Sequence, residues 1–224
     1  MFSGGRKLAC GLAVLVALFG LGAVAKTAAL TRWDTAFDER LAERRTSGLT
    51  WLAKAATDVA QTSVGVTLAL LLPLVLWMLH RRRDAVRVLL TFAGALTLTL
   101  VVKVTVAEHR PPARLWVEVP DTAQSFPSGH TTIAAALALA LVLVVRGRAR
   151  ALAAVLGVLL TAGVALARMY LGVHYPPDVA GGVLSVTAAL LLTLGFLELP
   201  PVARRLPPRD RPDNKLREAA AASR

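Results

Sequence analysis

The sequence of 224 residues has a single cysteine, Cys10, and only four histidines. One cysteine excludes an internal disulfide framework and a metal site built from several cysteines. Acidic residues are also few, 14 against 26 lysines and arginines, so the formal net charge is +12. A basic chain could bind nucleic acid, but here the basic residues lie between long apolar runs and not on a soluble domain. We therefore expect no nucleic-acid partner.

What the sequence has in abundance is apolar residues, 55% of the chain, against about 45–50% in a typical soluble domain. A helix needs about 20 mostly apolar residues to cross a bilayer. Six stretches qualify, although the fourth and fifth are short: 8–25, 59–79, 86–106, 131–145, 151–166 and 179–197. We predict an all-α, polytopic membrane protein with six transmembrane helices.

The first apolar stretch has a second interpretation. Arg6 and Lys7 precede it, and Ala23-Val24-Ala25 resembles a cleavage site, so this stretch could be a signal peptide. Its apolar core of about 18 residues is longer than that of a usual signal peptide, which favours a retained span.

The charges between the spans predict the orientation. With six spans both termini lie on one side, which has 16 basic and five acidic residues, whereas the other side has ten and nine. Basic loops stay in the cytoplasm, so we place both termini there, in a bacterial inner (plasma) membrane. Residues 1–199 are expected to form one domain, and residues 200–224 a basic, disordered cytoplasmic tail.

The first outer loop, residues 26–58, is predicted to form an amphipathic helix on the membrane surface. Trp33, Phe37 and Leu41 recur every four residues, with charged residues such as Asp38 between them. A polar loop with incidental aromatic residues is the alternative.

Three polar segments lie beside the later spans, all on the predicted outer face. The first has Lys103 and Arg110-Pro111. Seven residues make two helical turns, so we expect both cations on one face at the outer end of the third span. Arg110 has forked donors suited to two phosphate oxygens, and Lys103 adds a compact charge. Two basic residues that snorkel to lipid headgroups are the alternative.

The second segment, Pro127-Ser128-Gly129-His130, opens the fourth span. Free backbone amides at a helix N-terminus bind anions, and Gly129 lets a ligand approach the backbone. Ser128 adds a hydroxyl donor. A simple helix cap is the alternative, because Ser-Gly often precedes a helix.

The third segment combines Arg168, His174 and Asp178. Tyr175-Pro176-Pro177 is predicted to start the sixth span, so Asp178 lies in the first helical turn and can reach back to His174. A carboxylate on one imidazole nitrogen fixes the tautomer and leaves the other nitrogen as a nucleophile. A structural His–Asp pair is the alternative.

Together the three segments resemble the signature of the type 2 phosphatidic acid phosphatases, a family of integral membrane lipid phosphatases. The family pattern is Lys-x6-Arg-Pro, Pro-Ser-Gly-His and Ser-Arg-x5-His-x3-Asp. Here it reads KVTVAEHRP (103–111), PSGH (127–130) and ARMYLGVHYPPD (167–178), with matching spacing. Ala167 stands where the family has serine, and losing one neutral hydrogen bond, about 0.5–1.5 kcal/mol, should weaken binding or rate only. Thr131 or Tyr170 could compensate.

The resemblance implies a role for each residue of the signature. His174 is expected to attack phosphorus and form a phosphohistidine, Asp178 to orient His174, and His130 to protonate the leaving lipid oxygen. The remaining residues are expected to hold the phosphoryl oxygens: Lys103, Arg110, Ser128, Gly129 and Arg168. No metal or other cofactor is expected, because no carboxylate cluster of the kind that Mg²⁺ requires accompanies these segments.

The implied substrate is a lipid phosphate or diphosphate at the outer leaflet. Polyprenyl diphosphate, which we favour, phosphatidylglycerophosphate and phosphatidic acid are the candidates. Two other functions stay open: a phosphotransferase that passes the phosphoryl group to an alcohol, and a non-catalytic lipid-binding membrane protein. The sequence predicts no oligomeric state.

Overall fold

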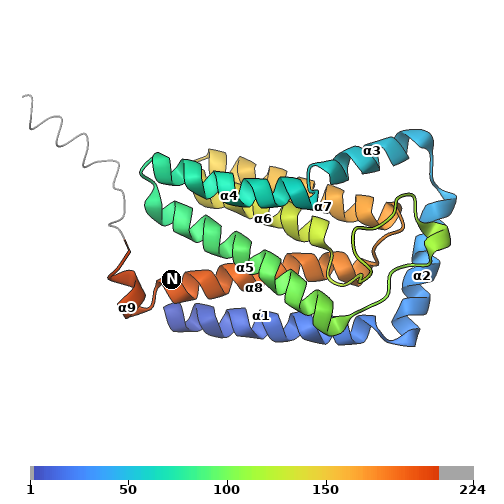
Figure 1. Ribbon diagram of the computed structural model, residues 1–224, viewed down its shortest axis with the longest axis horizontal. Helices are drawn as coiled ribbons and strands as arrows, with labels where there is room; N and C mark the ends of the chain where they lie inside the picture. Colours follow the sequence, from blue (N-terminus) through green and yellow to red (C-terminus); the bar gives the residue numbers. More distant parts are fainter. Residues whose placement is uncertain (1–2, 207–224) are drawn as a thin grey trace, which may run out of the picture.

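The structure, a computed structural model, describes residues 3–206 and is a bundle of long helices (Figure 1). Regular secondary structure in this range is entirely helical, so the predicted all-α fold is confirmed. The helices are α1 (Gly4–Ala25), α2 (Ala28–Glu43), α3 (Ser47–Asp58), α4 (Thr62–Met78), α5 (Arg82–Val106), the 3-10 turn η1 (Ala113–Leu115), α6 (Gly129–Val144), α7 (Ala149–Tyr170), α8 (Pro176–Leu197) and α9 (Pro200–Ala203).

Five helical stretches of residues 3–206 are long and apolar enough to cross a membrane: Gly4–Ala25, Ser47–Met78, Arg82–Val106, Ala149–Tyr170 and Pro176–Leu197. Each of the six predicted spans falls on one of the helices α1 and α4–α8. The helix missing from those five is α6, the fourth predicted span, which is apolar but has 16 residues, about 24 Å of helix, against a hydrocarbon core of about 30 Å. Outward-facing side chains are apolar, as for Val158 at 68% exposure, which suits contact with lipid.

α8 lies in the middle of the bundle, where it contacts α1, α5 and α6, while α7 packs on α6 and α4 packs on α5. Small residues bring α1 and α8 together. A Cβ on Gly11 would lie 2.9 Å from Leu192, and one on Gly195 would lie 2.7 Å from Leu8. The first apolar stretch is therefore an integral helix of the bundle, packed along its central helix.

The two ends of the bundle differ in what they carry. In Figure 1 the N-terminus and α9 lie at one end, and α2 and α3 lie at the other. Two helical connections, α5–α6 and α7–α8, contain the three polar segments. The first four residues of the predicted tail form α9, and residues 207–224 lie outside the described residues. That the α9 end faces the cytoplasm stays a prediction from the charge distribution.

The predicted outer-face helix is present as two helices, α2 and α3. On α2, the Trp33 and Phe37 rings stack with centroids 5.8 Å apart, and Trp33 is 59% exposed. A neighbouring face of α2, about 100° further around the helix, holds Asp34 and Asp38, both fully buried. The polar-loop alternative is therefore wrong, and α2 turns acidic residues toward the bundle.

Candidate active site

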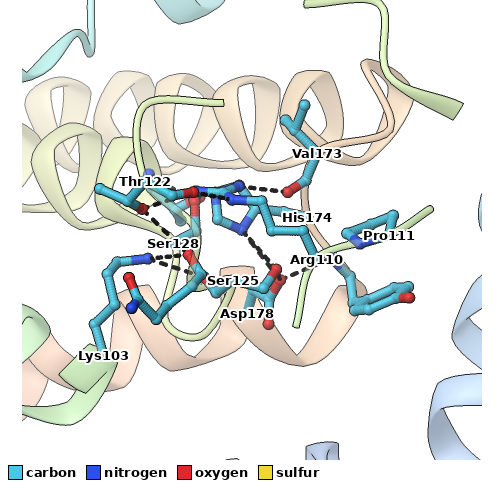
Figure 2. Close-up of polar contacts among 12 residues, drawn as sticks. Lys103, Arg110, Pro111, Thr122, Ser125, Ser128, Val173, His174 and Asp178 are labelled. Carbon is cyan, nitrogen blue, oxygen red and sulfur yellow. Dashed lines mark hydrogen bonds and ion pairs between the residues drawn. The ribbon is translucent and has the colours of Figure 1, made fainter. Parts of the chain in front are cut away.

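The three polar segments meet at the end of the bundle that holds α2 and α3. Figure 2 shows Lys103, Ser128 and Asp178 close together, although they come from α5, the N-cap of α6 and α8. The backbone N–H of Ser128 donates to the Asp178 carbonyl at 2.9 Å, which joins the second segment to the third. Helix packing thus brings residues that are far apart in the sequence into one polar region.

The predicted contact between His174 and Asp178 is present. Two prolines start α8, and Asp178 occupies its first turn, where Oδ2 accepts the Tyr175 N–H at 2.8 Å. The same oxygen lies 3.1 Å from His174 Nδ1. Asp178 is fully buried and His174 is 1% exposed. The helix start therefore fixes a carboxylate directly behind the imidazole.

The other nitrogen of His174 faces a guanidinium. Arg110 Nη1 lies 3.2 Å from His174 Nε2, and because a guanidinium can only donate, Nε2 must accept. Nδ1 then carries the ring proton, which it can share with Asp178. Burial, followed by the positive charges of Arg110, Arg168 and Lys103, holds the pKa of His174 well below its usual value. The imidazole is neutral, with its lone pair on Nε2.

Lys103 and Arg110 approach each other differently from what their spacing predicts. α5 ends at Val106, and Ala107 adopts the left-handed conformation with φ 49°, so Arg110 lies in the following loop. The prediction of one shared helical face is therefore wrong. Arg110 instead donates from Nη1 to the Val173 carbonyl at 2.6 Å, and from Nε to the Thr122 carbonyl at 2.6 Å.

Lys103 points into the protein. It is 8% exposed, and its Nζ donates to the carbonyls of Gln124 at 2.9 Å and Ser125 at 3.1 Å. A lysine that snorkels to lipid headgroups would extend outward, so the alternative interpretation of Lys103 is wrong.

The second segment combines a cap with open space. Ser128 is the N-cap of α6, and its Oγ accepts from the Thr131 hydroxyl at 3.1 Å. A Cβ built on Gly129 would meet no atom of residues 3–206 within 4 Å, so a ligand can approach the backbone there. His130, 7% exposed, has Nε2 4.0 Å from Asp121 Oδ2.

Arg168 has a partner and a spare donor. The buried guanidinium, 2% exposed, pairs through Nη1 with Glu118 Oε1, a carboxylate of the α5–α6 loop. Its Nε is buried without a hydrogen-bond partner in the described part of the chain. An anion that reached Arg168 would meet an unused donor and would compete with Glu118.

A cavity of about 540 Å³ opens between the α3–α4 junction and the α5–α6 loop. Its lining includes Asp58, Gln61, Glu118, Asp121, His130 and Arg168. Two residues of the predicted site therefore border a space large enough for a headgroup.

Ser125 is a member of this site that the sequence did not indicate. Its Oγ donates to Asp178 Oδ2 and lies 3.4 Å from His174 Nδ1, while its carbonyl accepts from Lys103. One buried serine thus connects the first and third segments. The one feature of the sequence that could have indicated Ser125 is its position two residues before Pro127. The loop residues Glu118 and Asp121 have no such feature.

Three more carboxyl groups approach Asp178 without any signal in the sequence. They are those of Asp34 and Asp38 on α2 and of Glu108 after α5, each of which interacts electrostatically with Asp178. No set of three or more His, Cys, Asp or Glu side chains among residues 3–206 is arranged to hold a metal ion.

Ala167, at the position of the family serine, packs in an apolar cluster with Ala53, Leu171 and Val173. Of the two residues expected to compensate, Tyr170 is engaged elsewhere, because its hydroxyl accepts the Thr46 N–H at 3.0 Å. Thr131 lies beside Ser128 and is the better placed of the two.

Comparison with known proteins agrees with this arrangement. The sequence profile described as the PAP2 superfamily matches residues 84–199, which include all three segments. A search of curated proteins finds no match. Among solved structures, the fold is similar to that of a transmembrane PAP2 type phosphatidylglycerolphosphate phosphatase from Bacillus subtilis. The TM-score is 0.69 and the identity 24%, over 84% of this chain and 93% of that chain.

The structural likeness supports the fold of an integral membrane protein, and the profile, which spans just over half of the chain, establishes the family. The expected class of enzyme, a phosphatase, is confirmed with it. The chain belongs to the PAP2 superfamily, the type 2 phosphatidic acid phosphatases.

Proposed function

We propose that this membrane phosphatase removes phosphate from a lipid phosphate or diphosphate by way of a phosphohistidine at His174, without a metal ion. The environment of His174 carries the proposal. Its Nδ1 faces Asp178 at 3.1 Å, and its Nε2 lone pair is directed at Arg110 at 3.2 Å. A nucleophile needs an unprotonated attacking atom and a fixed orientation, and this ring has both. Arg110 would turn its donor from Nε2 to a phosphoryl oxygen when the substrate binds.

In the first step, Nε2 of His174 attacks phosphorus, and the bond from phosphorus to the lipid oxygen breaks. The imidazole becomes cationic as the N–P bond forms, and Asp178 stabilises that charge through Nδ1–H. His130 gives a proton to the departing lipid oxygen, so an alcohol or a lipid monophosphate leaves in place of an unstable anion.

In the second step, His130, now neutral, takes a proton from water, and the hydroxide attacks the phosphohistidine. The N–P bond breaks, inorganic phosphate leaves, and His174 returns to its neutral form. The two histidines thus have different tasks, which suits their different surroundings. His174 is enclosed between Arg110 and Asp178, whereas His130 borders the cavity.

The phosphoryl oxygens would be held by Lys103, Arg110 and Arg168, with the amides near Gly129 and the Ser128 hydroxyl. Two of these cations, Lys103 and Arg110, donate mainly to neutral carbonyl groups. A phosphoryl group offers charged acceptors, which form stronger hydrogen bonds than carbonyls do. We infer that the substrate replaces these contacts and the ion pair of Arg168 with Glu118.

The lipid part of the substrate would lie in the cavity beside His130, because the proton donor must face the leaving oxygen. We place this cavity at the outer leaflet, following the charge distribution. Polyprenyl diphosphate, phosphatidic acid and phosphatidylglycerophosphate all present a terminal phosphate on a lipid, and the last is the class named for the Bacillus subtilis neighbour.

Phosphate release from the three lipids by purified protein in detergent with EDTA tests the reaction. We expect release by the wild type, loss in His174→Ala, and retention in His109→Ala, an exposed histidine at a position that the family signature leaves unspecified. Labelled phosphoryl groups should remain on the quenched wild-type enzyme and not on His174→Ala. Dependence on added metal, an active His174→Ala variant, or transfer of phosphate to an alcohol instead of water would each contradict the proposal.

The outer-face placement has a separate test. Val119, in the loop at the cavity, is 85% exposed, so Val119→Cys in a Cys10→Ser background offers a single thiol. A membrane-impermeant thiol reagent should label it in intact cells. Labelling only after the cells are broken would place the site on the cytoplasmic side.

A further inference from the structure

Three buried carboxyl groups near Asp178 have no part in the mechanism above. Asp34 and Asp38 are four residues apart on α2 and share its inner face, and Glu108 follows the end of α5. Asp34, Asp38 and Asp178 are fully buried, and Glu108 is 4% exposed. We call Asp34, Asp38, Glu108 and Asp178 the acidic cluster.

Most carboxyl oxygens of the acidic cluster have no hydrogen-bond partner among the described residues. Within residues 3–206, both carboxyl oxygens of Asp34, Asp38 and Glu108 lack a partner, as does Oδ1 of Asp178. Ionised carboxylates repel one another, and burying each without a partner is costly. Positive charge acts on the cluster from Lys26 and Arg45. Some members of the cluster must therefore keep their protons.

The surroundings indicate which members do so. Burial and the neighbouring Asp178 raise the pKa of Glu108 to about 9. Burial and the carboxylates of Asp34 and Asp178 raise the pKa of Asp38 to about 8, whereas Asp34 reaches only about 6. At neutral pH Glu108 is a carboxylic acid, and so it is a hydrogen-bond donor.

Glu108 is also tied to the site by its backbone. Its carbonyl accepts the Ser125 N–H at 2.9 Å, and Ser125 Oγ donates to Asp178 Oδ2. The side chains of Glu108 and Asp178 influence each other's pKa, so a hydrogen bond between them can form once one of the two carries a proton. Oδ2 of Asp178 receives its donors from Ser125, His174 and Tyr175, while Oδ1 has none among the described residues. A donor without an acceptor therefore faces an acceptor without a donor.

We propose that Glu108 is a positioning residue that donates its carboxyl proton to Oδ1 of Asp178, so that Asp178 stays ionised and aimed at His174. This inference rests on the proposed function, because the pair that Glu108 positions is the nucleophile and its orienting carboxylate. The proton is shared within a hydrogen bond, so no net transfer takes place. Both carboxylate oxygens of Asp178 then accept hydrogen bonds.

Loss of that proton should disturb the pair. As the pH rises through about 9, Glu108 becomes a second carboxylate beside Asp178, and repulsion displaces the group that orients His174. Charged or titratable groups that act on Glu108 or respond to it are Asp34 on α2, Lys26 between α1 and α2, and Asp178 and Tyr175 at the start of α8. Substituting Glu108 itself separates its contribution from theirs.

The first test compares Glu108→Gln with Glu108→Leu in a phosphate-release assay across the pH range. Glutamine keeps a neutral donor, so kcat at neutral pH should stay within about threefold of wild type, while leucine should lower it at least about tenfold. The alkaline loss of activity in the wild type should shift or vanish in Glu108→Gln. Glu43→Gln, at the exposed end of α2, is the matched control and should behave as wild type. Equal effects of glutamine and leucine, or an unchanged alkaline limb in Glu108→Gln, would overturn the proposal.

The second test requires neither catalysis nor a folded Glu108→Leu variant. At neutral pH the infrared spectrum of the full chain should contain carboxylic acid absorption from both Asp38 and Glu108. The difference spectrum of wild type minus Glu108→Gln should therefore contain a carboxylic acid band that is lost at alkaline pH. If that band is absent from the difference spectrum, Glu108 is ionised and the inference is wrong. If the band is present but the wild type releases no phosphate, the proposed function fails while the protonation of Glu108 stands.

Discussion

Charged residues at the two ends of the helix bundle have similar chemistry but differ in their burial and in their hydrogen-bond partners. At the α9 end, the carboxylate of Asp84 contacts three guanidinium groups, those of Arg81 at 2.6 Å, Arg146 at 3.4 Å and Arg87 at 3.6 Å. At the other end, Arg168 pairs with one carboxylate, Glu118. Lys103 and Arg110 there donate to neutral carbonyls.

The difference separates a structural ion-pair network from the proposed anion site. At the α9 end, Asp84 joins the start of α5 to the end of α6, and its three arginines are 25%, 33% and 57% exposed, so water and salt screen the positive charge that remains. Buried cations held mainly by carbonyls keep most of their attraction, because a charged acceptor binds them more strongly than a neutral one. Four changes, taken from the largest expected effect to the smallest, test this contrast.

The largest effect should come from replacing an arginine at each end by lysine. Arg168→Lys keeps the charge but loses the forked donors, so kcat/KM for phosphate release should fall about a hundredfold. Arg146→Lys changes an arginine of the Asp84 network that is half exposed, so kcat/KM should stay within about twofold. Steady-state kinetics of both variants give the answer. Equal losses would mean that the two ends do not differ in function.

Ser125→Ala should have the next largest effect. It removes the hydroxyl that donates to Asp178 Oδ2. Losing a hydrogen bond to a charged group should lower kcat about tenfold. Ser185→Ala is the matched control, since Ser185 is also fully buried but donates only to the Gly181 carbonyl, one turn earlier in α8. A full kcat in Ser125→Ala would show that His174 needs no support from this serine.

Neutralising one carboxylate at each end should change KM at one end and thermal stability at the other. Glu118→Gln removes the group that competes with phosphate for Arg168, so KM should fall about threefold to fivefold with kcat less affected. Asp84→Asn leaves three guanidinium groups without their shared carboxylate, so the thermal unfolding temperature should fall with KM unchanged. A higher KM in Glu118→Gln would mean that Glu118 positions Arg168 and does not compete for it.

The smallest effect is expected from Ala167→Ser. This change restores the family serine, but its surroundings are Ala53, Leu171 and Val173, so the gain in kcat/KM should be at most about threefold. Ala85→Ser, a buried alanine at the α9 end, is the control and should leave kcat/KM unaltered. A larger gain would show that the serine hydroxyl reaches the phosphoryl group despite its apolar neighbours.

Local patterns were sufficient for part of the site. The pairing of His174 with Asp178 follows from four residues of spacing across a proline-started helix, and the structure has that contact at 3.1 Å. The position of Ser128 and Gly129 at a helix start is likewise a local property. Each depends on a few neighbouring residues and on backbone rules that hold in any fold.

Other parts of the site depend on contacts between elements distant in the sequence. Arg110 was expected on the helix of Lys103, yet α5 ends before it. Arg110 lies in the following loop, where it is held by hydrogen bonds to the Thr122 and Val173 carbonyls. Ser125 and Glu118 stand in a loop without periodicity. Nothing local distinguishes them from ordinary loop residues, because their partners come from α7, α8 and the loop between these helices.

The sequence by itself determined the apolar helices, the three polar segments and the family, since lipid selects for length and hydropathy and the signature is a matter of spacing. Only the tertiary structure decided that Glu118 covers Arg168 and that α2 turns its acidic face toward Asp178. The physical reason is that charge compensation in a buried site depends on which side chains packing brings within hydrogen-bond distance, and a linear pattern does not encode those distances.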